Sequence, residues 1–398
     1  MKLGFSYHGI HDGMNPNSLQ DIPDGHRYGR PLFMEEVLKR GHELVCLQKR
    51  REDKHYVSKQ GYTAKACDDL DAPWLPNDLD VIFMEWRWST WKNDKTHPQH
   101  DPKRYEPDLD RQRALLARYH GKIPIVVWDT DLKITAQDER DWPELVIADP
   151  SFKTNRLTRD RVFVPFWTDW EKLMESTSYP YNYGYIGNRY ARDPEFEEFY
   201  YKPAQFLREF GRQTLMHGNW LQQSPERGDP ADLIKAARHV AFGHRMGFRD
   251  SMRLMSTFLC TTHVSKPKYY ELGFVSPRYL EALAVGCPAL VPAGFLKPDI
   301  LGSEWTVTDV NDVIAKVIQL SRMSSEERQR IVAVQREHMR SCSWGFDVKH
   351  AVDVLEDTAG IVSTIPCGTY GCTVPKKRHA IMCNQCTAEY REDPDAFK

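Results

Sequence analysis

Residues 276–292, SPRYLEALAVGCPALVP, place a carboxylate inside a short helical pattern. Ser276, Pro277 and Arg278 stand at the start of that pattern, where free N–H groups carry partial positive charge and suit a phosphate. Glu281 follows one turn later, where its carboxylate can accept hydrogen bonds from a pair of sugar hydroxyls. A nucleotide carries ribose beside a diphosphate at about that spacing. The alternative is that Glu281 is an ordinary solvated helix residue.

A second group of reactive residues lies near the C-terminus. Cys367, Cys372, Cys383 and Cys386 follow the spacing Cys-x4-Cys-x10-Cys-x2-Cys, which suits tetrahedral coordination of a structural zinc ion. Four unrelated thiols are the alternative, and His379 can replace one of the ligands. The sequence KKRH between the two pairs is a cation cluster that suits nucleic-acid phosphates, although a structural clip or a protein contact fits it equally.

The composition limits the classes of protein to consider. The chain has 398 residues, which predicts two domains, and a formal net charge of -2, which excludes a global basic field. No apolar run approaches the roughly 20 residues that cross a bilayer, and the N-terminus does not read as a signal peptide. We therefore expect a cytoplasmic protein (in the host cytoplasm if it is viral), with no membrane partner, that is a monomer.

Short apolar strands alternate with amphipathic helices along most of the chain, which predicts α/β domains with open parallel sheets. A Tyr/Ser/Pro/Asn-rich stretch near residues 170–184 predicts the linker between them. We predict an N-terminal Rossmann-like domain over residues 1–172, a second one over 173–360 that ends in the helix FDVKHAVDVLEDTAG, and a zinc-binding tail over 361–398. The segment STFLCTTHV fits either a strand or a helix end.

The stretch SPRYLEALAVGCPALVP resembles the nucleotide-sugar signature of GT-B glycosyltransferases, in which a Glu precedes a small-residue helix, Gly-x-Pro and a strand. The resemblance covers roughly residues 1–360 and includes the first strand, RGHEL, the linker and the restart at YIGN. It implies two Rossmann-like domains that face a cleft, a nucleotide-sugar donor with a UDP-sugar favoured, and contact of Glu281 with the donor ribose. It also implies that no catalytic metal is needed.

Transfer of a sugar from a nucleotide requires cations that stabilise the departing diphosphate. The candidates are Arg189 and Arg192, which follow YIGN, and Arg245 in FGHRMGFRD. The resemblance favours Arg189, because the first loop of the second domain faces the donor phosphates in this family. Each of these arginines can instead be a surface residue.

The acceptor hydroxyl requires a general base near the carboxyl end of a strand in the first domain. Asp129 and Asp131 end the strand IVVWDTD, and His8, His11 and Asp12 follow the first strand. The alternative for Asp131 is a helix cap or turn. In the loop EWRWSTWKND, the residues Trp86, Trp88 and Trp91 suit either core packing or stacking on a sugar or base.

The tail also resembles small CGT…CxxC modules at the ends of actinobacterial-phage proteins, which implies a viral origin. Phages use GT-B enzymes to glycosylate hydroxymethylated bases in their own DNA. The leading hypothesis is therefore a glycosyltransferase that acts on hydroxymethylated pyrimidines in double-stranded DNA. One alternative is a glycosyltransferase acting on a small molecule, a wall glycan or a protein, and another is a non-catalytic nucleic-acid-binding protein on the same scaffold.

Overall fold

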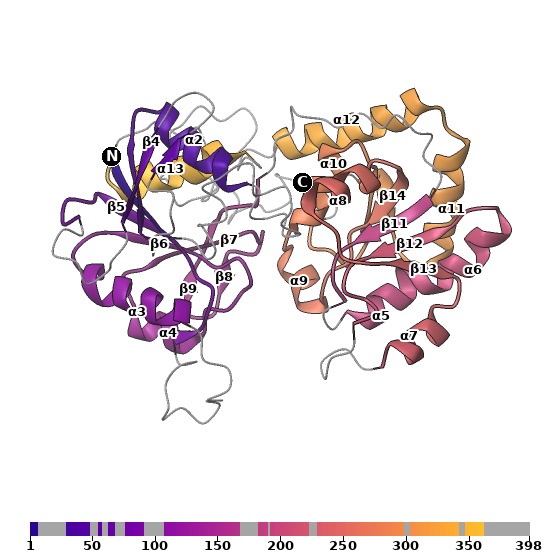
Figure 1. The fold of residues 1–398 in the computed structure, drawn as a ribbon, viewed down its shortest axis with the longest axis horizontal. Helices are drawn as coiled ribbons and strands as arrows, with labels where there is room; N and C mark the ends of the chain where they lie inside the picture. The colour runs from indigo at the N-terminus through magenta and orange to yellow at the C-terminus, as the bar shows by residue number, and fades with distance from the viewer. Residues whose placement is uncertain are drawn as a thin grey trace, which may run out of the picture. The chain divides into compact units, whose positions relative to one another are not determined.

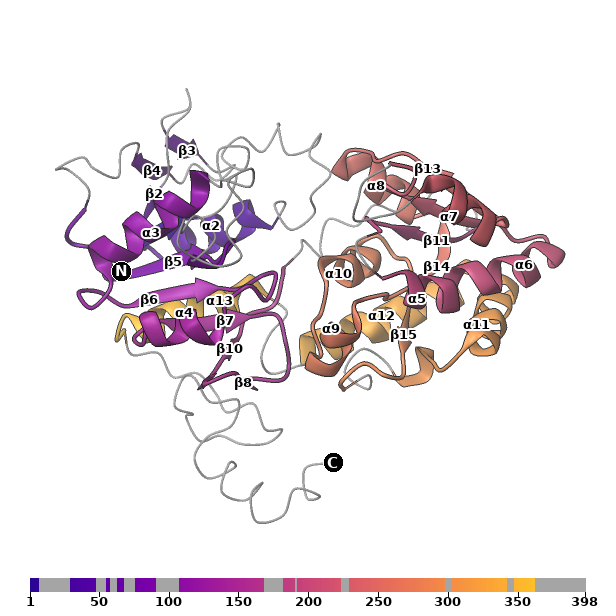
Figure 2. The ribbon, with the colours of Figure 1, turned by 90° about the horizontal axis from the view of Figure 1, so that it is seen from below.

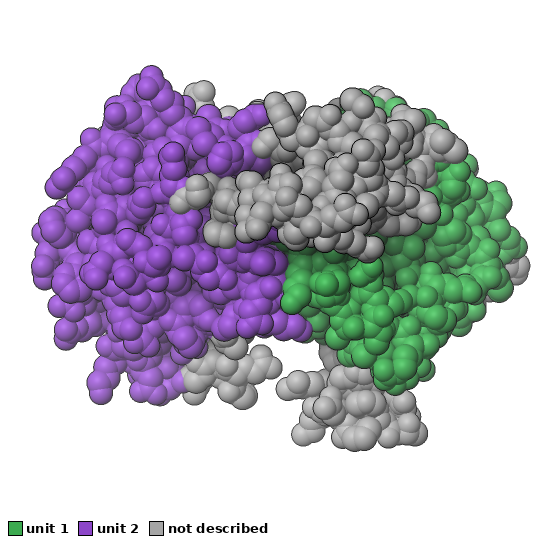
Figure 3. Space-filling model, turned by 180° about the vertical axis from the view of Figure 1, so that it is seen from behind, with its two compact units in different colours: residues 1–16, 30–165, 343–398 green, residues 17–29, 166–342 purple. Residues whose placement is uncertain are grey.

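The computed structural model describes residues 1–6, 29–47, 55–57, 63–67, 76–90, 107–167, 182–189, 192–222, 229–297, 303–341 and 347–361. The chain divides into two compact units, coloured separately in Figure 3. Unit 1 comprises residues 1–16, 30–165 and 343–398, and unit 2 comprises residues 17–29 and 166–342. No helix among the described residues is long and apolar enough to cross a membrane.

Unit 1 is built on a sheet with the strand order β10-β7-β6-β5-β1-β2-β4-β3, in which only β3 is antiparallel to its neighbour (Figure 1). Its strands are β1 (Lys2–Ser6), β2 (Glu43–Leu47), β3 (His55–Val57), β4 (Thr63–Cys67), β5 (Val81–Glu85), β6 (Ile125–Trp128), β7 (Val146–Asp149) and β10 (Val162–Phe163). A separate hairpin pairs β8 (Asn155–Arg156) with β9 (Arg159–Asp160). Its helices are α2 (Arg30–Lys39), α3 (Pro107–Tyr119), α4 (Ala136–Asp141) and α13 (Val348–Thr358).

The central strands of unit 1 are apolar on both faces, as expected for a parallel sheet covered by helices on each side. Every residue of β5 and β6 is buried. On one face the rings of Phe5, Phe33 and Phe83 lie 5.0 to 5.9 Å apart. On the other, Met84 and Trp86 belong to a cluster with residues of α3. Gly41, with φ +80°, follows the end of α2 at Lys39, where glycine tolerates the left-handed conformation that ends a helix.

Helix α13 belongs to unit 1, although the sequence led us to assign it to the second domain. Its apolar residues Ala351, Val352, Val354 and Leu355 are buried in unit 1, and a group of ion pairs joins it to the end of α2. Arg40 Nη1 bonds Asp353 at 2.7 Å and Glu356 at 3.0 Å, and His42 Nε2 lies 2.7 Å from the other oxygen of Glu356. The hydrophobic periodicity of α13 predicted the helix correctly, but it carries no information about which sheet the helix covers.

Unit 2 is built on a parallel sheet with the strand order β13-β12-β11-β14-β15-β16 (Figure 2). Its strands are β11 (Asn182–Ile186), β12 (Thr214–His217), β13 (Val240–Gly243), β14 (Phe258–Thr262), β15 (Ala289–Pro292) and β16 (Thr306–Val307). Its helices are α5 (Asp193–Phe196), the π-helix η5 (Glu197–Tyr201), α6 (Lys202–Glu209), α7 (Pro230–Ala236), α8 (Phe248–Met255), α9 (Pro267–Leu272), α10 (Pro277–Ala284), the 3-10 turn η7 (Ser303–Trp305), α11 (Val310–Arg322) and α12 (Ser325–Ser341). The segment that fitted either a strand or a helix end contains β14.

Each sheet reverses its strand order at one point. In unit 2 the chain proceeds outward from β11 through β12 and β13, and then returns to place β14 on the other side of β11. In unit 1 the corresponding reversal lies between β1 and β5. Open α/β sheets bind ligands outside the carboxyl ends of the strands at such a switch point. The loops after β11 and β14, and those after β5 and β6, are therefore where a site is expected.

Candidate active site

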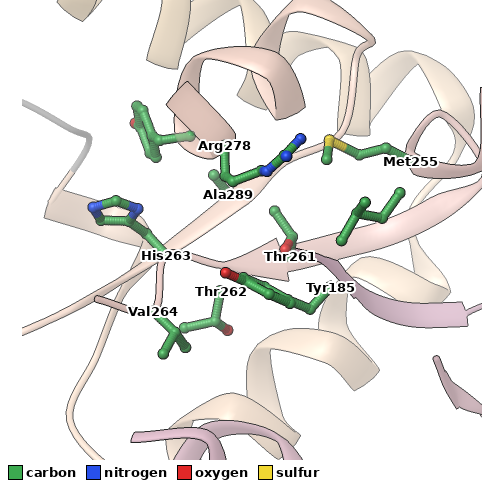
Figure 4. Close-up of a pocket in the computed structure, with 10 residues that line it drawn as sticks. Tyr185, Met255, Thr261, Thr262, His263, Val264, Arg278 and Ala289 are labelled. Carbon is green, nitrogen blue, oxygen red and sulfur yellow. The ribbon is translucent and has the colours of Figure 1, made fainter. Parts of the chain in front are cut away.

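The switch point of unit 2 contains a narrow cavity at the ends of β11 and β14 (Figure 4). Tyr185 and Thr262 line it from the strands, Val264 from the following loop, and Arg278 from α10. It has room for about one water molecule and is therefore too small to hold a nucleotide. The rim itself is the candidate donor site.

Glu281 is not a solvated helix residue. Its side chain is 3% exposed, and its Oε2 accepts a hydrogen bond of 2.5 Å from Nη1 of Arg278, one turn earlier in α10. Arg278 is partly exposed and lines the cavity, where Figure 4 shows it extending toward Met255. The helix start therefore presents a paired cation and carboxylate at the carboxyl edge of the sheet.

The first residues of α10 form a helix start without a side-chain cap. Ser276 is the N-cap residue in extended conformation, and Pro277 occupies the first helical position, which suits its fixed φ. The Ser276 hydroxyl makes no capping bond and lies instead 3.4 Å from Nδ1 of His263. Burial lowers the pKa of His263 to about 4, so this imidazole is neutral near pH 7.

The loop after β11 places two of the predicted arginines. Nε of Arg189 bonds Oδ1 of Asp193 at 2.7 Å, and its Nη1 has no hydrogen-bond partner among the residues that the structure describes. Arg192 donates to the carbonyls of Asn188 and Val264, at 2.5 and 3.2 Å. Arg192 thus connects the loops after β11 and β14, the two sides of the switch point, whereas the Arg189 guanidinium is paired with Asp193 and its Nη1 is buried.

The loops after β11, β12 and β13 are packed through glycines. A Cβ on Gly218, which has φ +151°, would lie 2.0 Å from the carbonyl oxygen of Gly187. A Cβ on Gly243 would lie 2.0 Å from the His217 ring. This close approach fixes the backbone at the rim. Arg245, in the next loop, is exposed, and the structure brings it to the same edge of the sheet but into no ion pair among the described residues.

In unit 1, Asp129 lies at the carboxyl end of β6 with an exposed fraction of 1%. Its two carboxylate oxygens accept the backbone N–H groups of Lys133 at 2.5 Å and Ile134 at 3.1 Å. Burial raises the pKa of Asp129 to about 6, against the opposing effect of these hydrogen bonds and of Arg161. A carboxylate with this proton affinity suits general base catalysis near neutral pH.

Asp131 lies in the same loop with a different environment. Its side chain is 43% exposed, and Oδ2 accepts a hydrogen bond of 2.7 Å from Nη1 of Arg87, at the end of β5. Asp131 is therefore a turn residue, as the alternative proposed, and not a helix cap, since Thr135 caps α4. Of the tryptophans in the Arg87 loop, Trp86 is buried in the core, while Trp88 is half-buried with the Arg87 guanidinium 5.5 Å from its ring.

Several predicted residues lie outside the described part of the chain. They are His8, His11, Asp12, Trp91, Cys367, Cys372, Cys383 and Cys386. Within the described ranges no group of three or more His, Cys, Asp or Glu side chains is arranged to hold a metal ion.

Sequence reasoning missed His263 at the donor rim, and Arg161 and Glu139 behind Asp129. His263 directly follows β14. If the apolar run before it had been assigned as a strand, His263 would have been identified as a polar residue at the carboxyl end of that strand. Arg161 and Glu139 are only 4% and 3% exposed. No local pattern distinguishes them from the many surface charges of this chain.

No protein-family model matches the chain, and no curated protein matches it. Solved structures do match. A variant of the T4 phage enzyme BGT in complex with UDP-glucose has a TM-score of 0.55 at 13% identity, over 90% of this chain and 99% of that one. An alpha-glucosyltransferase with UDP and a 13-mer DNA has a TM-score of 0.53 at 16% identity, over 89% and 99%. The O-GlcNAc transferase of Thermobaculum terrenum has a TM-score of 0.54 at 13% identity, over 91% and 67%. The chain therefore has the GT-B glycosyltransferase fold.

Proposed function

We propose that the protein is a glycosyltransferase that moves a sugar from a nucleotide diphosphate donor, with a UDP-sugar favoured, to a hydroxymethylated pyrimidine in DNA. The observation that carries the proposal is the buried Glu281 paired with Arg278 at the start of α10, on the carboxyl rim of a sheet with a switch point. A solved beta-glucosyltransferase of this fold is a DNA-modifying enzyme with UDP-glucose as substrate. An alpha-glucosyltransferase of the same fold binds UDP and DNA.

In this proposal Glu281 accepts hydrogen bonds from the two ribose hydroxyls of the donor. Arg278, Arg189 and the N-terminus of α10 at Ser276 and Pro277 stabilise the diphosphate. Arg192 acts mainly by holding the two loops of the rim together, because its guanidinium already bonds two backbone carbonyls. Arg245 is an exposed cation at the same edge and contributes through longer-range attraction.

On the acceptor side, a carboxylate of unit 1 removes the proton of the acceptor hydroxyl. The hydroxyl oxygen forms a bond to the anomeric carbon of the sugar, and the bond from that carbon to the diphosphate oxygen breaks. The negative charge that develops on the diphosphate is the charge that the cations of unit 2 stabilise. Asp129 is the preferred base because its pKa of about 6 keeps it largely deprotonated at pH 7 while it remains basic. Asp131 is the second candidate.

The test is to incubate the full chain with UDP-glucose labelled in the sugar and with duplex DNA containing 5-hydroxymethylcytosine or 5-hydroxymethyluracil. Unmodified duplex of the same sequence is the control. Label transferred to the modified duplex alone supports the proposal. Transfer to a small molecule, glycan or protein without transfer to any modified duplex would contradict the DNA acceptor. DNA binding with no nucleotide binding would support a non-catalytic scaffold instead.

A further inference from the structure

Behind Asp129, unit 1 contains a buried row of alternating charges. Glu139 lies on α4, and Arg161 lies between the β8–β9 hairpin and β10. Nη2 of Arg161 donates a hydrogen bond of 2.5 Å to Oε1 of Glu139, and Nη1 of Arg161 lies 3.9 Å from Oδ2 of Asp129. All three residues are at most 4% exposed. Water therefore screens these charges only weakly, and each affects the protonation of the others.

Glu139 determines where the Arg161 guanidinium lies. Its second oxygen, Oε2, accepts the backbone N–H of Thr158 at 2.9 Å and also the Thr158 hydroxyl. Thr158 stands in the hairpin turn beside Leu157, which has φ 53°. The Glu139 carboxylate is thus fixed from both sides. Nη1 and Nε of Arg161 have no hydrogen-bond partner among the described residues, so the cation faces Asp129 at ion-pair distance without bonding it.

Other charged groups also surround Asp129 and affect its protonation. Arg156 in the hairpin lowers the pKa of Asp129, although less than burial raises it, and Arg156 itself pairs with Asp149 at the end of β7. Glu85 at the end of β5 bonds the Thr130 hydroxyl at 3.1 Å. The other charged side chains on these elements and their connecting loops include Arg87, Asp131, Lys133, Asp138, Arg140, Asp141, Arg159 and Asp160.

We propose that Arg161 is a positioning residue for the base: held back by Glu139, its cation sets how readily Asp129 takes up and releases a proton. The inference rests on the proposed function, in which Asp129 accepts the proton of the acceptor hydroxyl. A direct hydrogen bond from Arg161 would stabilise the carboxylate too strongly for it to act as a base, whereas removal of the cation would leave the buried carboxyl protonated near neutral pH. The Glu139 anchor keeps Asp129 between these two states.

Substitutions of Arg161 and of Glu139 should consequently have opposite effects on the pKa of Asp129. Arg161→Gln removes the cation, so the pKa of Asp129 rises. Glu139→Gln keeps that cation but weakens its anchor and removes a negative charge, so the pKa of Asp129 falls. A purely structural role would give no such opposition, because loosening the loop from either side would alter the site in the same direction.

The experiment measures the pH dependence of kcat/KM for sugar transfer in the full chain. We expect the acidic limb to move to higher pH by about 1 to 3 units in Arg161→Gln and to lower pH in Glu139→Gln. Arg161→Lys, which keeps the charge, should return the limb toward that of the wild type. The matched control is Arg140→Gln on α4, next to Glu139, because Arg140 is exposed and bonds only Gln137 at 2.8 Å among the described residues. This control should leave the limb unchanged.

A second readout is independent of activity. The pH dependence of the melting temperature is compared between each protein and the same protein carrying Asp129→Asn, and the difference reports the titration of Asp129 alone. The midpoint of this titration should move to higher pH in Arg161→Gln and to lower pH in Glu139→Gln. If Asp129→Asn abolishes transfer but neither variant moves the limb or the midpoint, the role of Arg161 is wrong while the proposed function stands. If Asp129→Asn leaves transfer unchanged, the assignment of the base fails, and the inference fails with it.

Discussion

Arg278 and Glu281 form a 2.5 Å ion pair across one turn of α10, and the carboxylate of that pair is 3% exposed. An exposed pair three residues apart on a helix contributes only a few tenths of a kcal/mol, so this burial is not explained by helix stability alone. A buried carboxylate beside a half-exposed cation is, however, suited to a ligand that offers hydroxyls to one and phosphate to the other.

The first prediction concerns that pair. Glu281→Gln removes the charge from the hydrogen bonds to ribose, and we expect UDP to bind about 10- to 100-fold more weakly by isothermal titration calorimetry. Arg278→Gln should weaken UDP more than uridine, because it acts on the diphosphate. Glu304→Gln is the control, since Glu304 lies in the 3-10 turn η7, away from the switch point, and should leave UDP affinity unchanged. Equal loss of uridine and UDP affinity in Arg278→Gln would contradict the division of roles.

A second prediction follows from the buried carboxylate of unit 1. Asp129→Asn should lower kcat by about 100- to 10,000-fold, and the wild-type rate should fall below a pH of about 6 as Asp129 becomes protonated. Asp131→Asn should have the smaller effect and should leave that limb in place. A larger loss of kcat in Asp131→Asn than in Asp129→Asn would instead identify Asp131 as the base.

The same group has a consequence for stability. The pKa of Asp129 is raised in the folded protein from 3.8 to about 6, so its contribution is most favourable below pH 3.8 and is lost as the pH rises through 6. Asp129→Asn does not titrate, and it should gain roughly 2 kcal/mol relative to the wild type between pH 4 and pH 7. Urea unfolding at several pH values measures the difference. A constant difference across this range would show that Asp129 keeps its ordinary pKa in the folded state.

Gly218 provides a prediction about the donor rim. Alanine there would place a Cβ 2.0 Å from a backbone oxygen in a conformation with φ +151°, so we expect a loss of at least about 2 kcal/mol in the free energy of unfolding and weaker UDP binding. Gly211→Ala is the matched control, because Gly211 also has positive φ, at +70°, but has nothing within 4 Å of its Cβ position. It should cost about 1 kcal/mol and leave UDP binding intact. If the two substitutions behave alike, packing of the rim is not the cause.

The cysteines of the tail give a prediction from the sequence alone. Cys367, Cys372, Cys383 and Cys386 should bind zinc, measured as about one ion per chain by elemental analysis, and Cys383→Ser should lose it. Cys260→Ser is the control, since Cys260 is buried in the core of unit 2. If the tail positions DNA, chelation should raise KM for duplex without changing UDP affinity. A chain free of zinc after purification without chelators would contradict the site.

Much of this organisation was predictable from the sequence, for identifiable reasons. The apolar runs around Phe83 and Val126 predicted central strands, because parallel strands buried on both faces are continuous in hydrophobicity. Strand β11 begins at Asn182, inside the stretch near residues 170–184 that was predicted as the linker, so that boundary was placed too late. The helix-breaking residues Gly286 and Pro288 predicted the boundary between α10 and β15. The assignment of α13 failed because long-range ion pairs such as Arg40–Glu356 leave no local signal. The π-helix at Glu197–Tyr201 and the buried role of Arg161 were not predictable either, since both depend on tertiary packing.

Whether Glu281 holds the ribose of the donor is decided by the position of UDP in a crystal of the full chain soaked with the nucleotide. We expect density for ribose within hydrogen-bond distance of the Glu281 carboxylate, with the diphosphate at Arg278, Arg189 and the first turn of α10. Density for the nucleotide at any other place in unit 2, or a rim that stays unoccupied at concentrations that saturate binding in solution, would contradict this role of Glu281.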